Sequence, residues 1–266
     1  MNKKLLSAFA LVLCLALLCA GSLAEISVTK KNMTINRNLD KSVNNVVMIM
    51  QDGEWSDSIM IASINSKTGR SVMTCVDGNT PIELTNEKGE METVALGSVY
   101  VRGDQKSRGL LVARELNELL GLNISTYVGL DIQQLPSLVE HVGKLNMWLN
   151  DEEAAILGTW AGDNSLSGED VLKYVRIRLE SDYAEKNRSY MVFMDLLKQG
   201  LRSTSGANLM GLGKKLLSSM DTNLNVLTAV TMLGSFQGGS DRREIALMSS
   251  MTHDEMRAAF YREVYE

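Results

Sequence analysis

The chain has 266 residues, a net charge of −5 at pH 7 and 45% hydrophobic residues, which is the composition of a globular protein. Nucleic acid binding usually requires a basic face, so an acidic chain of this kind is not expected to bind nucleic acid. Only two prolines are present, which argues against a proline-rich spacer in a cell wall.

The N-terminus has the pattern of a secretory signal peptide, residues 1–24. Lys3 and Lys4 precede an apolar run that ends at Ala20, and Ser22-Leu23-Ala24 provides a small-x-small cleavage site. The run is shorter than the ~20 apolar residues of a spanning helix, although an uncleaved anchor is an alternative. We therefore expect a protein that is secreted or held at the extracytoplasmic face of the cell envelope.

Cleavage would change the charge and the cysteine content of the chain. It removes two lysines and no acid, which lowers the net charge from −5 to −7. Two of the three cysteines leave with the peptide, and Cys75 stays alone. A single thiol cannot build a disulfide framework or a cysteine-based zinc site. The rest of the chain is long enough for one large domain or two small ones.

The first part of the remaining chain predicts a sheet. Residues 25–43 are polar and rich in lysine, and we expect a flexible lead-in there. Three apolar runs at 45–50, 57–65 and 70–76 then predict strands, and a turn at 66–69 joins the last two. Because they are apolar at nearly every position, these strands suit the centre of a sheet.

Helices are expected from residue 104 onward. Leucines with helical recurrence at 104–122 predict an amphipathic helix that ends at Gly121, and a strand is expected at 125–132. Residues 145–150 form a strand or a stiff turn. The other helical patterns lie at 133–143, 167–175, 187–202, 207–220, 222–236 and in a C-terminal tail at 251–266. The order predicts a mixed α/β (α+β) fold, a single domain at 44–250 whose central β-sheet is covered by helices.

Two arginines are the best candidates for a functional site. If the backbone is extended at Tyr174, Arg176 and Arg178, their side chains share one face. Two guanidinium groups on one face suit a diphosphate, because each can bind phosphate oxygens in a bidentate manner. Alternatively, the arginines pair with nearby acids on a solvated surface; these acids are Glu180, Asp182 and Glu185.

A second polar cluster lies at 51–57, in the turn between the first two predicted strands. Its acids Asp52 and Asp57 could hold Mg²⁺, which prefers carboxylate and phosphate oxygens. Alternatively, the cluster is an ordinary polar turn. Acids for a metal together with arginines for phosphates are the minimum set for phosphoryl transfer. Residues 210–215 lack the spacing of a phosphate-binding loop, and we expect surface or capping roles for His141 and His253.

Several motifs in this order resemble the LytR-CpsA-Psr family of Gram-positive bacteria. They are VVMIMQD with SDSIMIASINSKTGRSVMT, LNELLGLNISTYVGLDIQQLPSLVEHVG, LSGEDVLKYVRIR and MDTNLNVLTAV, within residues 44–246. Members transfer glycopolymers from a polyprenyl-pyrophosphate carrier onto peptidoglycan at the membrane surface. The resemblance implies that Asp52 and Asp57 hold Mg²⁺. It also implies that Arg176 and Arg178 bind the pyrophosphate and act in catalysis, and that Arg188 belongs to the substrate site.

The sequence also departs from the family pattern. Asp77 and Glu185 stand where arginines are expected, Ser189 replaces a glutamine, and residues 94–98 replace a Lys-Asn-Ala-like stretch. Loss of one electrostatic contact to a transition state commonly costs several kcal/mol. Three interpretations therefore stay open: a glycopolymer transferase, an inactive lipid-glycan binding or regulatory module, and a polyprenyl-pyrophosphate hydrolase.

Overall fold

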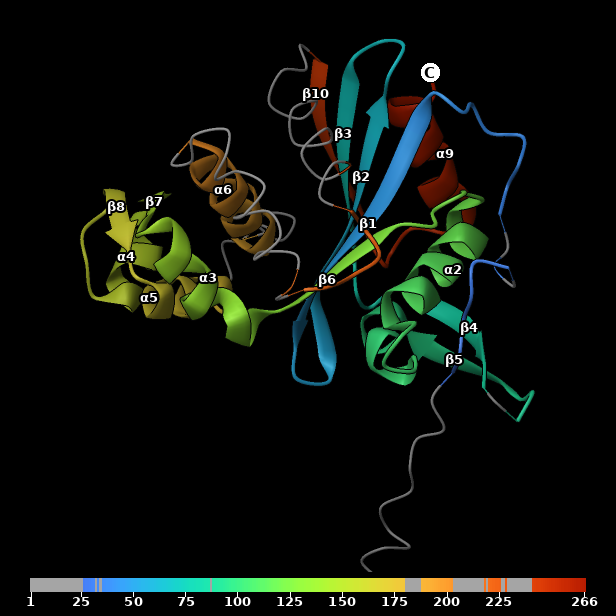
Figure 1. Ribbon diagram of the computed structural model, residues 1–266, viewed down its shortest axis with the longest axis horizontal. Coiled ribbons are helices and arrows are strands. Elements are labelled where there is room, and N and C mark those ends of the chain that lie inside the picture. Colours follow the sequence, from blue (N-terminus) through green and yellow to red (C-terminus); the bar gives the residue numbers. More distant parts are fainter. Residues whose placement is uncertain are drawn as a thin grey trace, which may run out of the picture.

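The computed structural model describes residues 26–31, 33, 35–86, 88–179, 188–202, 218, 220–225, 228 and 241–266. Within these residues the main feature is a six-stranded sheet with the order β10-β3-β2-β1-β6-β9 (Figure 1). Its strands are β1 (Val43–Asp52), β2 (Trp55–Asn65), β3 (Arg70–Val76), β6 (Tyr127–Asp131), β9 (Asp221–Thr222) and β10 (Asp241–Leu247). The three apolar runs are therefore strands, as the sequence predicts.

Four strands of this sheet run in the same direction. β1 pairs with β6 in parallel and β3 pairs with β10 in parallel, while β2 lies antiparallel between β1 and β3. The short β9 is antiparallel to β6. The carboxyl ends of β1, β3, β6 and β10 consequently meet at one edge of the sheet.

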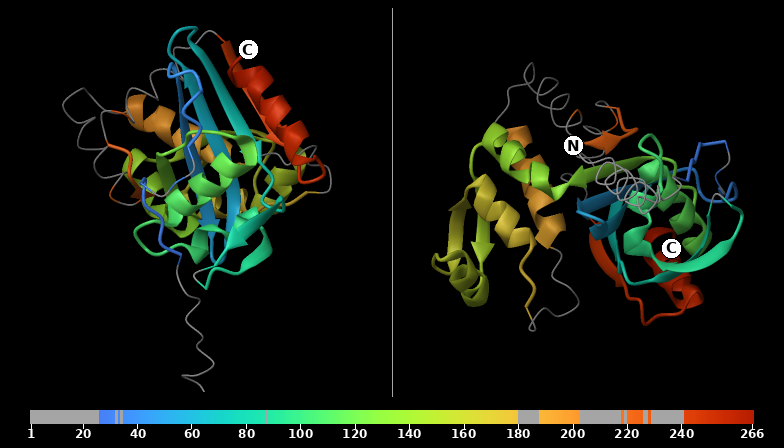
Figure 2. Two further views of the ribbon diagram at one scale, coloured as in Figure 1. Left: turned by 90° about the vertical axis from the view of Figure 1, so that its right-hand side faces the viewer. Right: turned by 90° about the horizontal axis from the view of Figure 1, so that it is seen from below.

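Helices cover both faces of the sheet (Figures 1 and 2). One face packs against α2 (Arg108–Leu120), α9 (His253–Val264) and the hairpin of β4 (Pro81–Thr85) and β5 (Met91–Ala95). The other face packs against α3 (Leu135–Val142), α5 (Gly168–Val175) and α6 (Arg188–Arg202). Outside this second layer lie β7 (Leu145–Leu149), α4 (Asp151–Leu157) and β8 (Gly162–Leu166); the short 3₁₀ helices are η1 (Leu96–Ser98), η2 (Tyr100–Arg102) and η3 (Ile132–Gln134).

The alternation of side chains along the strands separates two cores. Val47 and Ile49 of β1 point into the core that contains α2 and α9. Met48 and Met50 point into the opposite core, where Met60 also lies, as expected from the two-residue period of a strand. The core beneath α3, α5 and α6 is therefore rich in methionine, whose unbranched side chain fits irregular spaces.

Both ends of the described chain pack against this fold. Val28 lies in the expected lead-in, yet it is 2% exposed, and Ile26 forms an isolated bridge with Gly103. Met256 and Phe260 of α9 are fully buried. The packed domain thus includes residues on both sides of the 44–250 range expected from the sequence. No helix in the part of the chain that the structure describes is long and apolar enough to span a membrane.

Other parts of the fold differ from the sequence-based expectations. The β4–β5 hairpin, α4, β8 and β10 were not predicted, and residues 145–149 are a strand rather than a turn. Thr222 ends strand β9 instead of starting a helix. The predicted helices at 207–220 and 222–236 otherwise lie almost entirely outside the described residues. The other expected helices are confirmed as α2, α3, α5, α6 and α9.

Candidate functional site

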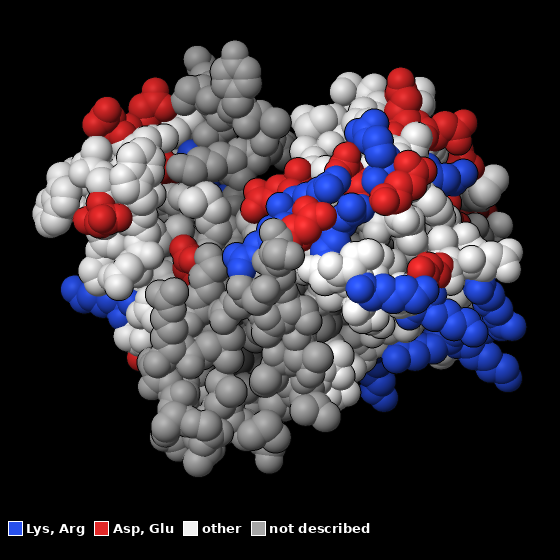
Figure 3. All heavy atoms as spheres, turned by 90° about the horizontal axis from the view of Figure 1, so that it is seen from above, with Lys and Arg blue, Asp and Glu red and all other residues white. Residues whose placement is uncertain are grey.

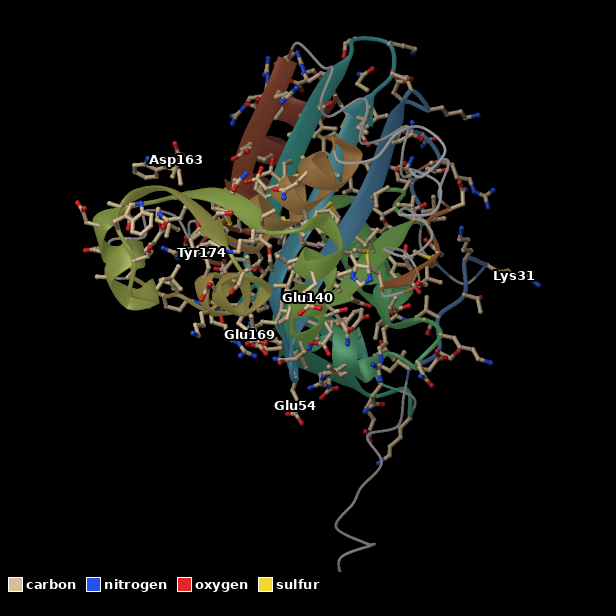
Figure 4. The ribbon with its side chains drawn as sticks, turned by 60° about the vertical axis from the view of Figure 1, so that its left-hand side comes forward. Lys31, Glu54, Glu140, Asp163, Glu169 and Tyr174 are labelled. Atoms are coloured by element: carbon tan, nitrogen blue, oxygen red, sulfur yellow. The ribbon has the colours of Figure 1, made fainter. Side chains whose placement is uncertain are left out.

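The carboxyl edge of the sheet collects the polar residues of the site. β1 ends at Asp52, β6 ends at Asp131, and Asp77 follows β3 directly. Glu54, at the tip of the β1–β2 turn, marks the position of this edge in Figure 4. In open sheets with parallel strands, ligands bind in the crevice outside the carboxyl ends. This edge is therefore the candidate functional site.

Asp52 and Arg176 form a bidentate ion pair at this edge. Arg176 donates from Nε to Asp52 Oδ2 over 2.9 Å and from Nη2 to Oδ1 over 2.7 Å. Gln133 also donates to Oδ1, over 3.3 Å. The hydrogen bonds from Arg176 lower the pKa of Asp52. The side chain of Arg176 is 43% exposed and that of Asp52 is 32% exposed, so this charged pair is accessible to a ligand.

Arg178 lies close to the same carboxylate. Its charge contributes to the lowered pKa of Asp52, and its Nη1 donates to the backbone carbonyls of Val175 and Ile177. Both arginines lie at the C-terminal end of helix α5, whose start is fixed by a capping box between Ser167 and Asp170. Arginines near a helix C-terminus are favoured by its orphan carbonyl groups.

The local conformation differs from the extended one considered from the sequence. Arg176 is the C-cap residue of α5 with αR torsion angles, and Tyr174 is a fully buried helical residue. The condition of an extended backbone, under which these two side chains would share one face, is not met, because α5 runs from Gly168 to Val175. The packing of α5 nevertheless brings Arg176 to Asp52, 124 residues earlier in the chain.

Arg188 lies in a buried pair rather than at the open site. Its Nε donates to Glu153 Oε1 over 2.9 Å, and the two side chains are 3% and 0% exposed. Its Nη1 donates to the carbonyl of Ile177 over 3.0 Å, and its guanidinium lies 5.8 Å from the centre of the Tyr174 ring. Arg188 thus holds the backbone between Arg176 and Arg178, and this placement gives no support to direct substrate binding.

Asp77 has its charge satisfied by neighbouring donors. It accepts hydrogen bonds from the backbone N–H groups of Asn79 and Ser249 and from the Asn79 side chain. Burial alone would raise the pKa of Asp77, but these hydrogen bonds together lower it. The residue that replaces an expected arginine therefore joins the end of β3 to the loop after β10.

The described residues do not test the Mg²⁺ site expected at Asp52 and Asp57, because the side chain of Asp57 lies outside them. They include no group of three or more histidines, cysteines or acids that could hold a metal. The carboxylate of Asp52 is paired with Arg176, and Mg²⁺ is usually held by one or two carboxylates together with waters and substrate phosphates. Asp57 lies in β2, but its side chain is outside the described part of the structure, as are Glu185 and the rest of residues 180–187.

Two residues of the site were not expected from the sequence. Gln133, which lies in η3 directly after β6, reaches Asp52, and Glu153 pairs with Arg188. Asn150 and Glu153 have the spacing of a capping box, which predicts a helix start. That spacing gives no indication that Glu153 will accept a hydrogen bond from residue 188.

The fold and the site define a class of protein: a sheet between two helical layers, with an arginine–carboxylate cluster at its carboxyl edge. The LytR_cpsA_psr family model matches residues 24–264, and the chain belongs to that family. Biofilm regulatory protein A of Streptococcus mutans is 23% identical over 186 residues, which are 64% of this chain and 45% of that protein. The chain thus spans less than half the length of this relative.

Solved structures of the family have the same fold. Bacillus subtilis TagV matches with a TM-score of 0.65 and 16% identity, over 85% of this chain and 98% of that one. TagT with bound octaprenyl pyrophosphate lipid matches with a TM-score of 0.64 and 14% identity, over 90% and 99%. TagT bound to LI-WTA matches with a TM-score of 0.65 and 15% identity, again over 90% of this chain and 99% of that one. The resemblance and the fold inferred from the sequence are confirmed.

Proposed function

We propose that this protein binds a polyprenyl-pyrophosphate-linked glycan and transfers the glycan to peptidoglycan at the outer face of the membrane. The observation that carries the proposal is the exposed, bidentate pair of Arg176 with Asp52, with Arg178 beside it. The lipid pyrophosphate bound by TagT and the wall polymer LI-WTA support the same class of ligand. The signal peptide expected from the sequence agrees with this location.

The pyrophosphate would take the place of Asp52 as the partner of Arg176. A phosphate group presents two oxygens to a guanidinium as a carboxylate does, and Arg binds both in a bidentate manner. Arg178 adds a second positive charge. Together they neutralise the pyrophosphate and then the leaving polyprenyl phosphate, which is the main requirement of phosphoryl transfer.

In the proposed reaction an acceptor hydroxyl oxygen forms a bond to the phosphorus that carries the glycan. The bond between that phosphorus and the bridging oxygen breaks, and polyprenyl phosphate leaves. The hydroxyl proton passes to a base, for which Asp52 is available once Arg176 has turned to the pyrophosphate. Asp52 and Asp57 would hold the Mg²⁺ expected from the sequence, and that ion would neutralise charge on the pyrophosphate; no step is routed through it.

For the prenyl chain we propose the methionine-rich layer beneath α3, α5 and α6, which is filled by its own side chains here and would have to open. Met48, Met50 and Met60 point from the sheet into this layer, and Met147 and Met194 line it from β7 and α6. Methionine adapts its shape and is frequent where one surface binds varied apolar partners. Because α5 ends at Arg176, this layer leads to the arginine cluster.

An inactive binding module is the second candidate, and Asp77 is the observation that favours it. Where the family has an arginine, this carboxylate is held by Asn79 and Ser249. The site therefore lacks one cation that would stabilise transition-state charge. Such a protein would bind the carrier without turnover.

A transfer assay tests the proposal. Purified protein is incubated with peptidoglycan and a polyprenyl-pyrophosphate carrier labelled in the glycan, with and without Mg²⁺ and a chelator. Labelled peptidoglycan that disappears with Arg176→Ala would support the transferase. Carrier binding with no labelled peptidoglycan would support the binding module, and labelled glycan released into solution would identify a hydrolase.

A further inference from the structure

The unit formed by β7, α4 and β8, residues 145–166, carries most of the exposed large apolar side chains that the structure describes. Trp160 is 71% exposed, Trp148 is 60% exposed and Ile156 is 55% exposed; the others among the described residues are Trp55 and Met91. Tryptophan is usually well buried. Exposed apolar groups gathered on one unit mark an interaction surface.

The strand register places Trp148 on an outward face. It lies opposite Asp163 in the β7–β8 hairpin, and Asn146 lies opposite Ser165. All four side chains are exposed, while the alternate residues Leu145, Met147, Leu149 and Leu166 are buried in the core. Figure 4 shows Asp163 pointing outward from this end of the molecule. An indole ring and a carboxylate thus stand side by side across two strands.

Trp160 is held at the same unit by its backbone. It precedes β8 by two residues, and its carbonyl accepts a hydrogen bond from Asn164 Nδ2 over 2.8 Å. Thr159 Oγ1 donates to Asn164 Oδ1 over 2.7 Å, which fixes the connection from α4. The capping box of Asn150 and Glu153 fixes the start of α4. Both tryptophans therefore project from an ordered backbone, so little conformational entropy is lost when a ligand binds.

The charge around these rings disfavours anionic partners. No lysine, arginine or histidine occurs from 145 to 172, while six acids do; Glu153 is buried against Arg188, and the other five are Asp151, Glu152, Asp163, Glu169 and Asp170. In Figure 3 the end of the molecule that carries this unit shows acidic side chains over a mostly uncharged surface, with basic side chains only at its lower margin. An anionic lipid surface binds basic segments and is repelled by acids. A neutral partner with many hydroxyl groups has no such penalty.

Sugar chains have the chemistry that matches this surface. The face of an indole ring is negative, so it attracts the weakly positive C–H groups on the flat side of a pyranose ring. Carboxylate and amide groups such as Asp163 and Asn146 can bond to sugar hydroxyls. We propose that Trp148 and Trp160, with Asp163 and Asn146, form a binding surface for a neutral polysaccharide.

This surface is distinct from the arginine cluster, and the inference does not depend on the transfer reaction. Helix α5 alone separates the end of β8 from Arg176. A helix of eight residues is about 12 Å long. A polysaccharide on the surface could therefore extend toward the carboxyl edge of the sheet, which would hold the glycan acceptor near the pyrophosphate of the carrier.

Binding of chitohexaose, a neutral β-1,4-linked hexosamine oligosaccharide, tests the inference by titration calorimetry without any lipid. Trp148→Ala and Trp160→Ala should each weaken binding about tenfold, as expected for aromatic anchors. Met91→Ala is the matched control, since it removes another exposed apolar side chain, which is 70% exposed on β5. Asp163→Ala should weaken binding without changing an aromatic ring, and circular dichroism confirms that each variant is folded.

Three results would overturn the inference. The first is no heat of binding with millimolar chitohexaose in the wild type. The second is unchanged affinity in both tryptophan variants. The third is a tryptophan-dependent interaction with a different partner only, either phosphatidylcholine vesicles in a flotation assay or a second copy of the chain in sedimentation velocity. Carrier binding is measured separately, so failure here leaves the proposed function standing.

Discussion

The buried pair of Arg188 and Glu153 provides a quantitative test of how the site is held. Arg188→Met keeps much of the side-chain volume but removes the charge, which leaves the buried carboxylate of Glu153, 0% exposed, without this cation. It also removes the hydrogen bond to the carbonyl of Ile177. The second effect acts on the segment between Arg176 and Arg178, so ligand binding should fall together with stability.

The expected magnitude follows from the environment of the pair. Removal of one partner of a buried ion pair costs about 3–5 kcal/mol, because the other charge stays uncompensated. The free energy of unfolding of a native protein is only about 5–15 kcal/mol, so this loss is a large part of the total. The double variant Arg188→Met/Glu153→Gln removes the stranded charge and keeps an acceptor for the Asn150 backbone. It should recover about 2 kcal/mol relative to the single variant.

Urea denaturation followed by circular dichroism measures both values from the midpoint and slope. A loss below about 1 kcal/mol for Arg188→Met would refute the reasoning, because it would mean that Glu153 finds water or another donor. A double variant no more stable than Arg188→Met would refute the assignment of the cost to a stranded charge. Lys173→Met, which removes an exposed lysine 4.0 Å from Asp170, is the control and should change stability little.

Three further outcomes follow from the described contacts. Arg176 lowers the pKa of Asp52, so the ionised carboxylate stabilises the folded protein above pH ~4, and this stability is lost as the pH falls below that value. The difference in unfolding free energy between wild type and Asp52→Asn should therefore shrink when urea denaturation is repeated in acid. Gly109→Ala places a Cβ 1.9 Å from the Tyr127 ring and should cost about 1–3 kcal/mol by overpacking, measured by thermal unfolding. Asp77→Asn should destabilise the protein by about 1–3 kcal/mol, because the charged acceptor of the Ser249 N–H is lost.

Local patterns predicted the centre of the fold well. The first three strands were visible because nearly every residue is apolar, as in a buried strand. Strand β10 was missed because four of its seven residues are charged. These charges are stabilised by contacts from other elements, such as Arg70 of β3 with Asp241 and Arg243 with Glu263 of α9. Contacts between residues so far apart in the chain cannot be predicted from the local sequence of the strand.

The sequence pointed to three residues that the structure brings together, but not to their geometry. Family motifs identified Asp52, Arg176 and Arg178, and the structure brings them together. The same motifs could not show that Arg176 ends a helix. They also could not show that Arg188 is buried against Glu153, because that contact depends on how α4 and α6 pack.

The affinity for octaprenyl pyrophosphate, measured by titration calorimetry, tests the central claim most directly. The wild type is compared with Arg176→Ala/Arg178→Ala and with Arg37→Ala/Arg262→Ala, which removes two surface charges elsewhere. Each hydrogen bond to a charged group contributes about 1.5–3 kcal/mol, so the site variant should bind at least about 100-fold more weakly. The control should bind like the wild type. Absence of binding in the wild type, or equal affinity in the site variant, would contradict the account.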